Sequence, residues 1–355
     1  MKVRLIGQIN DSGIGTHFHG YVSAVQRIKE LNDQIEIINF QDREALAQAA
    51  RASTVNDIAI SFVCTAMTPH FRGTNINWTV FESTRVPSHL MPILNDNDIW
   101  IPTEWGRKMA IENGLDIERI DVIPEGVDGD LFHPYFNKDN NGPFRFLIIG
   151  KYERRKSINE TIDAFVKSFR NNSQVELVIK SDFFVEPEKK RLELIEKINS
   201  TNCANIHLVW GYQTRTELAE LYRSADVFVF PTKAEGWGLP LMEAAACGLP
   251  LITTYYSGQT EFLQHIRSSC VFVDYSLQDI DCAEYQGFYR EADGRYGQWA
   301  VSTVDAIAQA MQQAHSQYPA LRQQARKNST IVRNQYSWAN SVTKSLEILQ
   351  KRGLL

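Results

Sequence analysis

The chain has 355 residues, which is long for a single hydrophobic core, so two domains are the expected number. Hydrophobic residues make up 43% of it and charged residues 22%, as in an ordinary globular protein. The net charge of −5 argues against a general nucleic-acid-binding protein, and no apolar run approaches the ~20 residues that a membrane span needs.

The N-terminal residues lead directly into an apolar run at residues 3–6, which predicts a first strand and no signal peptide. The five cysteines show no paired spacing. The sequence therefore predicts reduced thiols in a cytoplasmic protein, with neither a zinc site nor a disulfide framework. The cysteines are Cys64, Cys203, Cys247, Cys270 and Cys282.

After this strand, the first half of the chain alternates amphipathic stretches with apolar runs. A helix is predicted over residues 18–31, with Tyr21, Val22, Val25 and Ile28 on its apolar face. Further strands are predicted at residues 35–40, 58–63, 77–81, 99–102 and 122–124. This alternation is typical of an α/β domain, in which helices cover a parallel sheet.

A loop rich in Asn, Asp, Gly and Pro at residues 134–143 marks a linker. The second half alternates in the same way, with strands predicted at residues 144–150, 175–179, 206–209, 227–230, 251–253 and 271–273. Helices are predicted at residues 186–198, 304–314, 321–332 and 341–351, and the polar stretch 278–298 is predicted to be an inserted loop. Two similar α/β halves predict two Rossmann-like domains that face a cleft.

Residues 231–252 place two acids near the carboxyl end of a predicted strand, where open parallel sheets bind ligands. Glu235 lies in a loop in which Gly236 and Gly238 allow positive φ and a close approach to a ligand. Glu243 follows inside a predicted helix that Gly248 ends. Either acid alone is more often a helix-dipole partner or a solvent-facing side chain. Together, beside the free N–H groups of a helix start, they suit a neutral, hydroxyl-rich ligand.

A basic turn, Gly150-Lys-Tyr-Glu-Arg-Arg-Lys156, follows the first strand of the second half. Its four cations are Lys151, Arg154, Arg155 and Lys156, and at the carboxyl end of a strand they could hold a diphosphate. Without further context, a solvated basic turn is the better interpretation.

Two weaker signals lie in the first half. Gly13 and Gly15, between the first strand and helix, could turn backbone N–H groups toward an anion, although many tight turns look the same and the third glycine of a dinucleotide fingerprint is missing. His17 and His19 follow and are more often structural than catalytic. The other weak signal is Glu82, an acid in the stretch Trp78-Thr-Val-Phe-Glu.

The stretch from Glu235 to Glu243 resembles the signature of retaining nucleotide-sugar glycosyltransferases of the GT-B fold, the family-four-like or group 1 enzymes. Their pattern is Glu, Gly, aromatic, Gly, Leu, Pro, two more residues and Glu, and this chain matches it without a gap. The resemblance implies a GT-B fold whose C-terminal helix crosses back to the first domain. Residues 1–138 and the helix 338–355 would form the acceptor domain, and residues 139–337 the nucleotide-sugar donor domain.

The resemblance also implies roles for individual residues. Glu235 would bind donor-sugar hydroxyls and Glu243 the ribose hydroxyls, while Lys151 and Lys156 would hold the diphosphate. The chain has lysine at position 151, where arginine is usual, and Ser157 where glycine is usual. The residue that binds the diphosphate is therefore left open among the four cations of the basic turn. The remaining implied donor contacts are Gly13, Gly15, Arg155, Tyr212, Gly236, Trp237, Gly238 and Leu239.

Many members have a histidine near the position of Glu82, beside the reactive carbon of the sugar. Glu82 could therefore contact the acceptor hydroxyl or the donor sugar. An ion pair with Arg85 at a strand end is an equally good interpretation.

The function implied is transfer of a hexosyl group, with retention, from a UDP- or GDP-sugar to a hydroxyl of a glycan, lipid-linked or protein-linked acceptor, as in polysaccharide biosynthesis. The nucleotide sugar is a co-substrate, and neither a metal nor another cofactor is implied. A GT-B nucleotide-sugar epimerase or hydrolase and a non-catalytic nucleotide-sugar-binding subunit are the alternatives. A peripheral association with the inner membrane face and the oligomeric state are left open.

Overall fold

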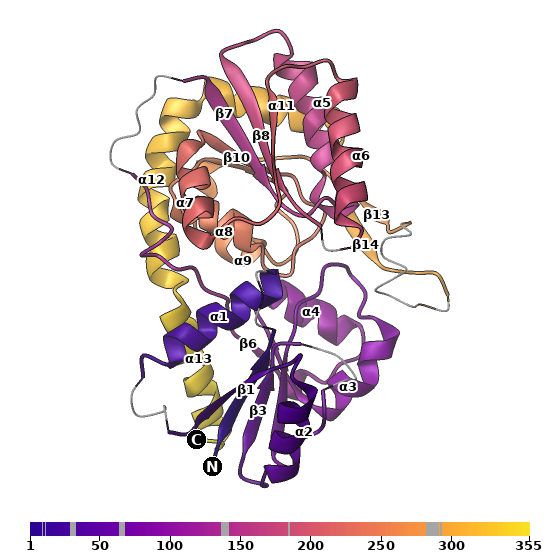
Figure 1. The fold of residues 1–355 in the computed structure, drawn as a ribbon, viewed down its shortest axis with the longest axis vertical. Coiled ribbons are helices and arrows are strands. Elements are labelled where there is room, and N and C mark those ends of the chain that lie inside the picture. The colour runs from indigo at the N-terminus through magenta and orange to yellow at the C-terminus, as the bar shows by residue number, and fades with distance from the viewer. Residues whose placement is uncertain are drawn as a thin grey trace. The chain divides into compact units, whose positions relative to one another are not determined.

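A computed structural model describes residues 1–8, 10, 12–28, 33–63, 68–135, 142–183, 185–281, 291 and 293–355 (Figure 1). The chain forms two compact units. The first comprises Met1–Asp128, Ile280–Gly297 and Gln335–Leu355, and the second comprises Gly129–Asp279 and Gln298–Asn334. The sequence placed the division near residue 138, inside the linker, and left residues 280–297 with the second half.

The first unit is built on a parallel sheet with the strand order β2-β1-β3-β4-β5-β6. The order reverses between β1 and β3, which is where such sheets bind ligands. Its strands are β1 (Val3–Gly7), β2 (Ile35–Asn39), β3 (Ile58–Ser61), β4 (Thr74–Trp78), β5 (Asp98–Ile101) and β6 (Ile120–Val122). Its helical elements are α1 (Gly13–Val25), α2 (Arg43–Ala52), η2 (Ser88–Leu90), α3 (Met91–Asp96), α4 (Glu104–Glu112), η3 (Ile117–Arg119) and α13 (Trp338–Lys351).

Helix α1 begins at Gly13, whereas the sequence predicted a start at Phe18. Ser12 caps the helix, because its Oγ accepts a hydrogen bond from the N–H of Gly15 at 3.1 Å. The two glycines therefore lie in the first turn of the helix rather than in a loop before it. A Cβ atom on Gly15 would lie 1.9 Å from the carbonyl oxygen of Asn10, so only glycine fits there.

The predicted return of the C-terminal helix to the first unit is confirmed. Helix α13 packs on α1, where the Tyr21 hydroxyl and Ser345 Oγ are 2.6 Å apart. A Cβ atom on Gly20 would lie 2.2 Å from the indole ring of Trp338, so the two helices approach closely at this point.

The second unit is built on a parallel sheet with the strand order β12-β11-β10-β7-β8-β9, which is the Rossmann order. Its strands are β7 (Phe144–Ile149), β8 (Val175–Ser181), β9 (Ile206–Trp210), β10 (Val227–Phe230), β11 (Leu251–Thr253) and β12 (Cys270–Phe272). Its helical elements are η4 (Arg154–Lys156), α5 (Ile158–Phe169), α6 (Pro187–Ser200), α7 (Arg215–Ser224), α8 (Leu239–Ala246), α9 (Thr260–Leu263), η5 (Arg267–Ser269), α11 (Val304–Ser316) and α12 (Tyr318–Gln335).

The central strands of this sheet carry the core of the second unit. All four residues of β10 are fully buried, and so are Phe146 and Ile148 of β7. On one face of the sheet, apolar residues of α5 and α11, including Phe165 and Met311, pack against Phe146, Ile148, Val227 and Val229. Helices on both faces of the sheet explain why these strands are continuously apolar rather than alternating.

The prediction of an irregular loop over residues 278–298 was wrong at both ends. Strands β13 (Ser276–Asp279) and β14 (Gln298–Val301) pair as an antiparallel hairpin. Residues 276–279 are all exposed and three of the four are polar, which hides the strand from a hydrophobicity pattern. Residues 282–290 and 292, within the predicted loop, lie outside the described residues.

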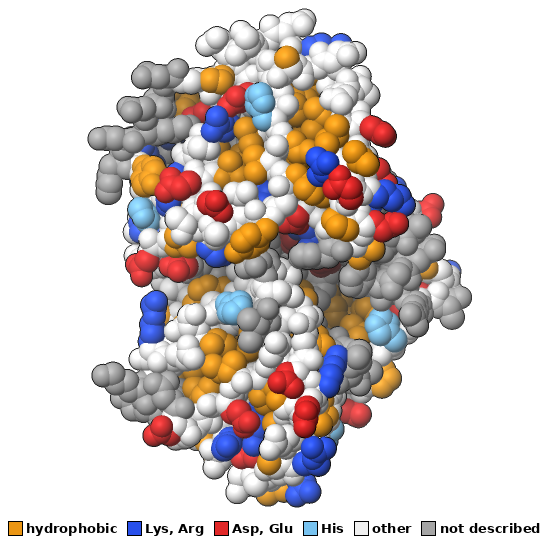
Figure 2. Space-filling model, viewed as in Figure 1, with side chains coloured by type: hydrophobic (Ala, Val, Ile, Leu, Met, Phe, Trp, Pro, Cys, Tyr) orange, Lys and Arg blue, Asp and Glu red, His pale blue; other side chains and the backbone are white. Residues whose placement is uncertain are grey.

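Charged side chains of both signs are mixed over the face of the molecule shown in Figure 2, which agrees with the small net charge of −5. In the part of the chain that the structure describes, no helix is both long enough and apolar enough to cross a membrane.

Candidate active site

Two neighbouring strands bring together the basic turn and the acidic loop. Strands β7 and β10 pair in parallel, with Phe146 opposite Val227. Because parallel strands end at the same edge, residues 150–156 after β7 meet residues 231–238 after β10. The strand order reverses between β7 and β10, so the two loops meet at the topological switch point of the second sheet.

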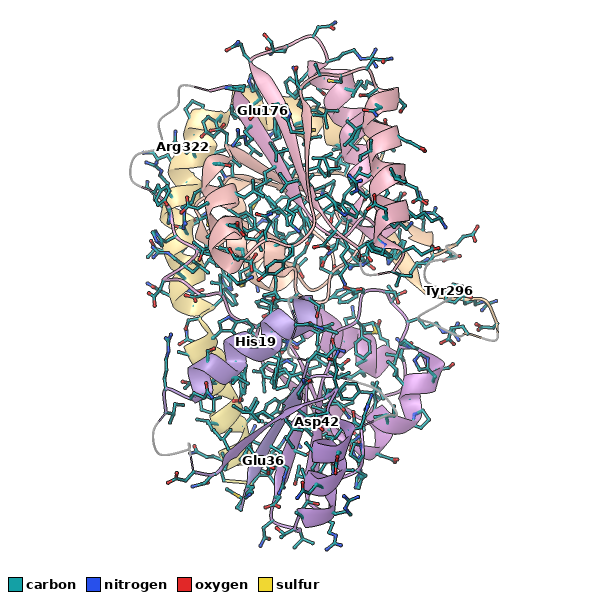
Figure 3. All side chains as sticks on the ribbon, viewed as in Figure 1. His19, Glu36, Asp42, Glu176, Tyr296 and Arg322 are labelled. Atoms are coloured by element: carbon teal, nitrogen blue, oxygen red, sulfur yellow. The ribbon has the colours of Figure 1, made fainter. Side chains whose placement is uncertain are left out.

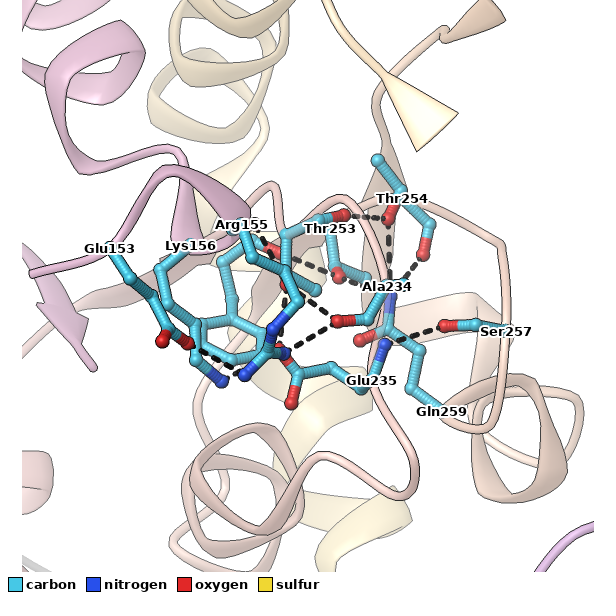
Figure 4. Close-up of polar contacts among 11 residues, drawn as sticks. Glu153, Arg155, Lys156, Ala234, Glu235, Thr253, Thr254, Ser257 and Gln259 are labelled. Carbon is cyan, nitrogen blue, oxygen red and sulfur yellow. Dashed lines mark hydrogen bonds and ion pairs between the residues drawn. The ribbon is translucent and has the colours of Figure 1, made fainter. Parts of the chain in front are cut away.

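Glu235 is the centre of a buried polar network at this point (Figure 4). Its Oε1 accepts hydrogen bonds from Lys156 Nζ at 2.7 Å, Arg155 Nη1 at 2.8 Å and Thr232 Oγ1 at 2.6 Å. Arg155 also donates to the carbonyl of Ala234 at 2.6 Å. Lys156 lies over the ring of Phe230, 5.0 Å from its centroid. The carboxylate and both cations are nearly inaccessible to solvent.

The two cations keep Glu235 ionised. Burial alone raises the pKa of this carboxyl group, but the charges of Arg155 and Lys156 outweigh burial and hold the pKa below its ordinary value. A charge pair of this kind is strongly destabilising to break, because the remaining partner stays buried without a counter-charge. The network therefore fixes the position of Glu235 and of both cations.

The second oxygen of Glu235 remains available to a ligand. All three hydrogen bonds go to Oε1, and the described residues supply no donor to Oε2. Figure 4 shows this oxygen outside the network of dashed lines. A carboxylate oxygen can accept two hydrogen bonds, which suits a sugar bearing adjacent hydroxyls.

The ionisation of Glu235 predicts a pH dependence of stability. Because folding lowers the pKa of this group, its stabilising contribution is present above the unfolded-state value near 4.5 and is lost as the pH falls through the lower folded-state pKa. Wild type should thus exceed Glu235→Gln in free energy of unfolding at pH 7, and the difference should shrink below about pH 4.5. Urea unfolding of both proteins across this range measures the difference; a constant difference would contradict the prediction.

The loop after Glu235 has the expected helix start. Gly238 has φ of 95° at the N-cap of α8, Leu239 is the first helical residue, and Gly248 follows the helix with φ of 75°. The positive φ predicted for Gly236 is not observed. Trp237 is buried, with its Nε1 donating to Met242 Sδ at 3.3 Å, so this residue offers a ligand its backbone rather than its ring.

Glu243 belongs to a second buried network. Its Oε1 accepts a hydrogen bond from Arg215 Nη1 at 2.6 Å, and its Oε2 accepts one from the Tyr222 hydroxyl at 2.9 Å. Burial and the adjacent carboxylate raise the pKa of Tyr222 well above its ordinary value, so Tyr222 stays a donor. The side chain of Arg215 is 35% exposed, so the network reaches the surface on that side.

The other predicted residues of the second unit lie around these networks. Lys151 is half-buried directly after Gly150, at the carboxyl end of β7, and Arg154 is exposed on η4. Tyr212 is 63% exposed and follows Gly211, which has φ of 94° after β9. Of the four cations in the basic turn, Arg155 and Lys156 are the two that reach Glu235.

Glu82 lies in the first unit, beyond the end of β4 at Trp78, and is half-buried. Arg85, its predicted alternative partner, pairs instead with Asp293 at 2.9 Å and with Glu291 at 3.3 Å. The interpretation of Glu82 as the partner of Arg85 is therefore not supported.

His17 has the structural surroundings that the sequence favoured. It is buried among the rings of Phe62, Trp78 and Trp338, and its Nδ1 lies 3.5 Å from a carboxylate oxygen of Glu125. Burial lowers the pKa of His17 to about 3, so this ring is neutral near pH 7. Among the described residues, no cluster of three or more His, Cys, Asp or Glu side chains could hold a metal ion.

Residues 133–281 match the family Glycosyl transferases group 1. This segment contains the Glu235 and Glu243 networks and the basic turn. The match assigns residues 133–281 to the group 1 glycosyltransferases.

Individual relatives agree with this assignment. D-inositol 3-phosphate glycosyltransferase from Paenarthrobacter aurescens is 29% identical over 170 residues, which are 45% of this chain and 41% of that relative. The chain thus spans less than half the length of this curated relative.

Two solved structures share the fold over the whole chain. HepE from Anabaena, in complex with UDP and glucose, has a TM-score of 0.74 at 12% identity and covers 99% of this chain and 100% of its own. Sucrose-phosphate synthase from Thermosynechococcus elongatus has a TM-score of 0.73 at 16% identity over the full length of both chains. The fold is GT-B.

Sequence reasoning missed the residues that support Glu235 from the loop after β11. The backbone N–H of Glu235 donates to Ser257 Oγ at 2.8 Å, and its carbonyl accepts from the N–H of Gly258 at 2.9 Å. A Cβ atom on Gly258 would lie 2.0 Å from the carbonyl oxygen of Gly236. The available signal was the Ser-Gly pair after the strand that neighbours β10. Arg215 and Tyr222, the partners of Glu243, carried no comparable signal.

The structure shows why glycine is usual in the family at the position of Ser157. This serine joins η4 to α5 with φ of 54° and ψ of 34°, the left-handed region, in which glycine costs less than other residues. Ser157→Gly should therefore raise the free energy of unfolding by about 0.5–1 kcal/mol. Urea unfolding measures this, with Ser157→Ala as the control that keeps the strain. A loss of stability in Ser157→Gly would contradict the prediction.

Proposed function

We propose that this chain is a retaining hexosyltransferase that uses a nucleoside-diphosphate sugar, with UDP or GDP as the nucleotide, and a hydroxyl of a glycan or glycoconjugate as acceptor. The observation that carries the proposal is the geometry of Glu235. Its ionised carboxylate is held by Arg155 and Lys156 at the switch point of the second sheet, with one oxygen left for a ligand. The likeness of the fold to HepE in complex with UDP and glucose supports the same substrate class.

In the proposed reaction, each network serves one part of the donor. Glu235 Oε2 accepts hydrogen bonds from sugar hydroxyls, and Glu243 accepts from the ribose hydroxyls beside Arg215. Lys151 and Lys156 lie where β7 ends and neutralise the diphosphate. The remaining predicted donor contacts, at Gly13, Gly15, Arg155, Tyr212, Gly236, Trp237, Gly238 and Leu239, are part of this proposal.

The chemical step breaks the bond between the anomeric carbon and the diphosphate oxygen and forms a bond from that carbon to the acceptor oxygen. The transition state resembles an oxocarbenium ion, and negative charge grows on the leaving diphosphate. Preorganised cations stabilise this charge without reorganising during the reaction, so no metal is required for the proposed step. With attack from the face of the leaving group, a diphosphate oxygen takes the acceptor proton. Glu82 is proposed to contact the acceptor hydroxyl or the donor sugar.

Thermal unfolding with a series of nucleotide sugars and nucleoside diphosphates tests the donor class. A ligand that binds only the folded protein stabilises it by about 2.7 kcal/mol at 100 times its dissociation constant, so one nucleotide series should raise the melting temperature clearly above the others. Failure of every series would overturn the proposal.

The product distinguishes the alternatives. Incubation of the selected donor with simple acceptors, followed by NMR of the anomeric proton, should show a new glycoside with the donor's configuration. Turnover of the donor without any acceptor would instead indicate an epimerase or hydrolase. Binding without turnover under any condition would indicate a nucleotide-sugar-binding subunit.

A further inference from the structure

The second unit has a small cavity at the edge of its sheet opposite Glu235. Asp226 and Pro250, which precede β10 and β11, both line it, and Glu235 follows the other end of β10. Its volume is about 30 Å³. Sites for whole sugars or nucleotides measure about 300–1,000 Å³, whereas a water molecule needs about 10–15 Å³. The cavity therefore suits a group no larger than one small ion.

Three arginines line this cavity, and Arg223 is the buried one. Its Nη1 donates to the carbonyl of Leu131 at 2.8 Å and its Nη2 to Glu220 Oε1 at 2.7 Å. Its Nε is buried and has no hydrogen-bond partner among the described residues. Burying a charged group is costly unless its charge is balanced, so an anion in the cavity beside Arg223 would stabilise this guanidinium.

The other two arginines come from α12; Figure 3 labels Arg322 there. Arg326 Nη2 donates to the carbonyl of Tyr135 at 3.3 Å, and the guanidinium of Arg322 lies 5.7 Å from the ring centroid of Tyr318. Within the part of the chain that the structure describes, no carboxylate pairs with either arginine.

The acids near the cavity are already engaged. Asp226 accepts hydrogen bonds from the Tyr318 hydroxyl at 2.8 Å and from the N–H of Arg145 at 2.8 Å. Glu220 accepts from the Tyr135 hydroxyl at 2.6 Å as well as from Arg223. Three guanidinium groups against two carboxylates leave the described surroundings with one excess positive charge.

We propose that this cavity binds a tetrahedral oxyanion, either inorganic phosphate or the phosphate end of a phosphomonoester whose body stays in solvent. Guanidinium groups match phosphate oxygens in geometry and charge, and several of them converge here on a space of the right size. The proposal does not depend on the transferase activity.

Such an anion would join two of the four chain connections between the second unit and the first. Residues 129–135 follow the last residue of the first unit's long segment, Asp128, and α12 ends where the first unit resumes. Arg223 already holds Leu131, and Arg326 holds Tyr135. A bound anion would connect these two arginines, and with them the entering segment and α12.

Equilibrium dialysis with labelled inorganic phosphate tests the proposal at constant ionic strength. The double variant Arg322→Gln/Arg326→Gln should bind one phosphate fewer per chain than wild type, or bind it at least about tenfold more weakly. Lys327→Gln, an exposed cation on the same helix, is the matched control and should bind as wild type does. Near-UV circular dichroism checks that both variants keep the fold.

Phosphate bound in the candidate active site is separated by repeating the dialysis in a Lys156→Met background. Phosphate binding at the arginine-lined cavity should remain in this background, and the double arginine substitution should weaken it as it does in the wild-type background. Unchanged phosphate binding in the double variant, or no saturable binding by wild type or any variant, would overturn the proposal and indicate that the cavity holds only water. Competition by glycerol 3-phosphate would identify a phosphomonoester as the ligand, and its absence would identify inorganic phosphate.

Discussion

Glu235→Gln is expected to lower the rate of sugar transfer by about 100-fold or more while leaving nucleoside-diphosphate affinity within about threefold. The amide keeps an oxygen for Arg155, Lys156 and Thr232 but removes the charge, and at the Oε2 position it offers either a neutral oxygen or an N–H donor. A sugar hydroxyl that donates to a carboxylate loses its best partner. Steady-state kinetics with the selected donor, together with titration of the nucleoside diphosphate, measures both effects.

Glutamine is a sharper test than alanine because the network is buried. Alanine would remove the hydrogen-bond acceptor that the two buried cations share as well as its counter-charge, and the loss of activity could then follow from a rearranged basic turn. Glu153→Gln is the matched control: Glu153 Oε1 accepts from Arg155 Nη2 at 2.7 Å but is assigned no substrate contact. A similar loss of activity in Glu153→Gln, or full activity in Glu235→Gln, would remove Glu235 from the sugar site.

The strands could be predicted wherever both faces of the sheet are covered. In β10 every residue is buried, so the apolar run marks the strand without ambiguity. Strand β4 was placed too late because it contains Asn75 and Asn77, and Asn77 is buried although it is polar. Helix α1 was started too late because two glycines, which are poor helix formers, occupy a first turn that the Ser12 cap stabilises.

The candidate site was predictable to the extent that it is continuous in sequence. The acidic loop and the basic turn each follow one strand, and the expectation that ligands bind at carboxyl ends brings them to one edge. The contacts that fix Glu235 were less predictable. Thr232 lies only three residues before Glu235, but Ser257 acts through a tertiary hydrogen bond from the loop after β11. The sequence also could not show that Oε1 of Glu235 accepts its hydrogen bonds from the protein while Oε2 remains available to a ligand.

A second large effect is expected on the affinity for the nucleoside diphosphate, and it tests which of the four cations of the basic turn binds it. Lys156→Ala is expected to weaken binding of the nucleoside diphosphate by about 10- to 100-fold, because a charge-assisted hydrogen bond to phosphate contributes about 1.5–3 kcal/mol. Lys156 is buried and fixed by Glu235 and by the ring of Phe230, so little side-chain entropy remains to be lost when it binds phosphate. Isothermal titration calorimetry measures the dissociation constant.

Arg154→Ala is the control for this substitution, since it removes the same charge from the same turn at an exposed position. An exposed charge is screened by solvent and salt, so its loss should change the dissociation constant by no more than about threefold. If both variants bound equally weakly, the diphosphate would respond to the net charge of the turn and not to a positioned lysine. If Lys156→Ala bound normally, the buried lysine would serve only to hold Glu235, and the diphosphate would have to be assigned to Lys151.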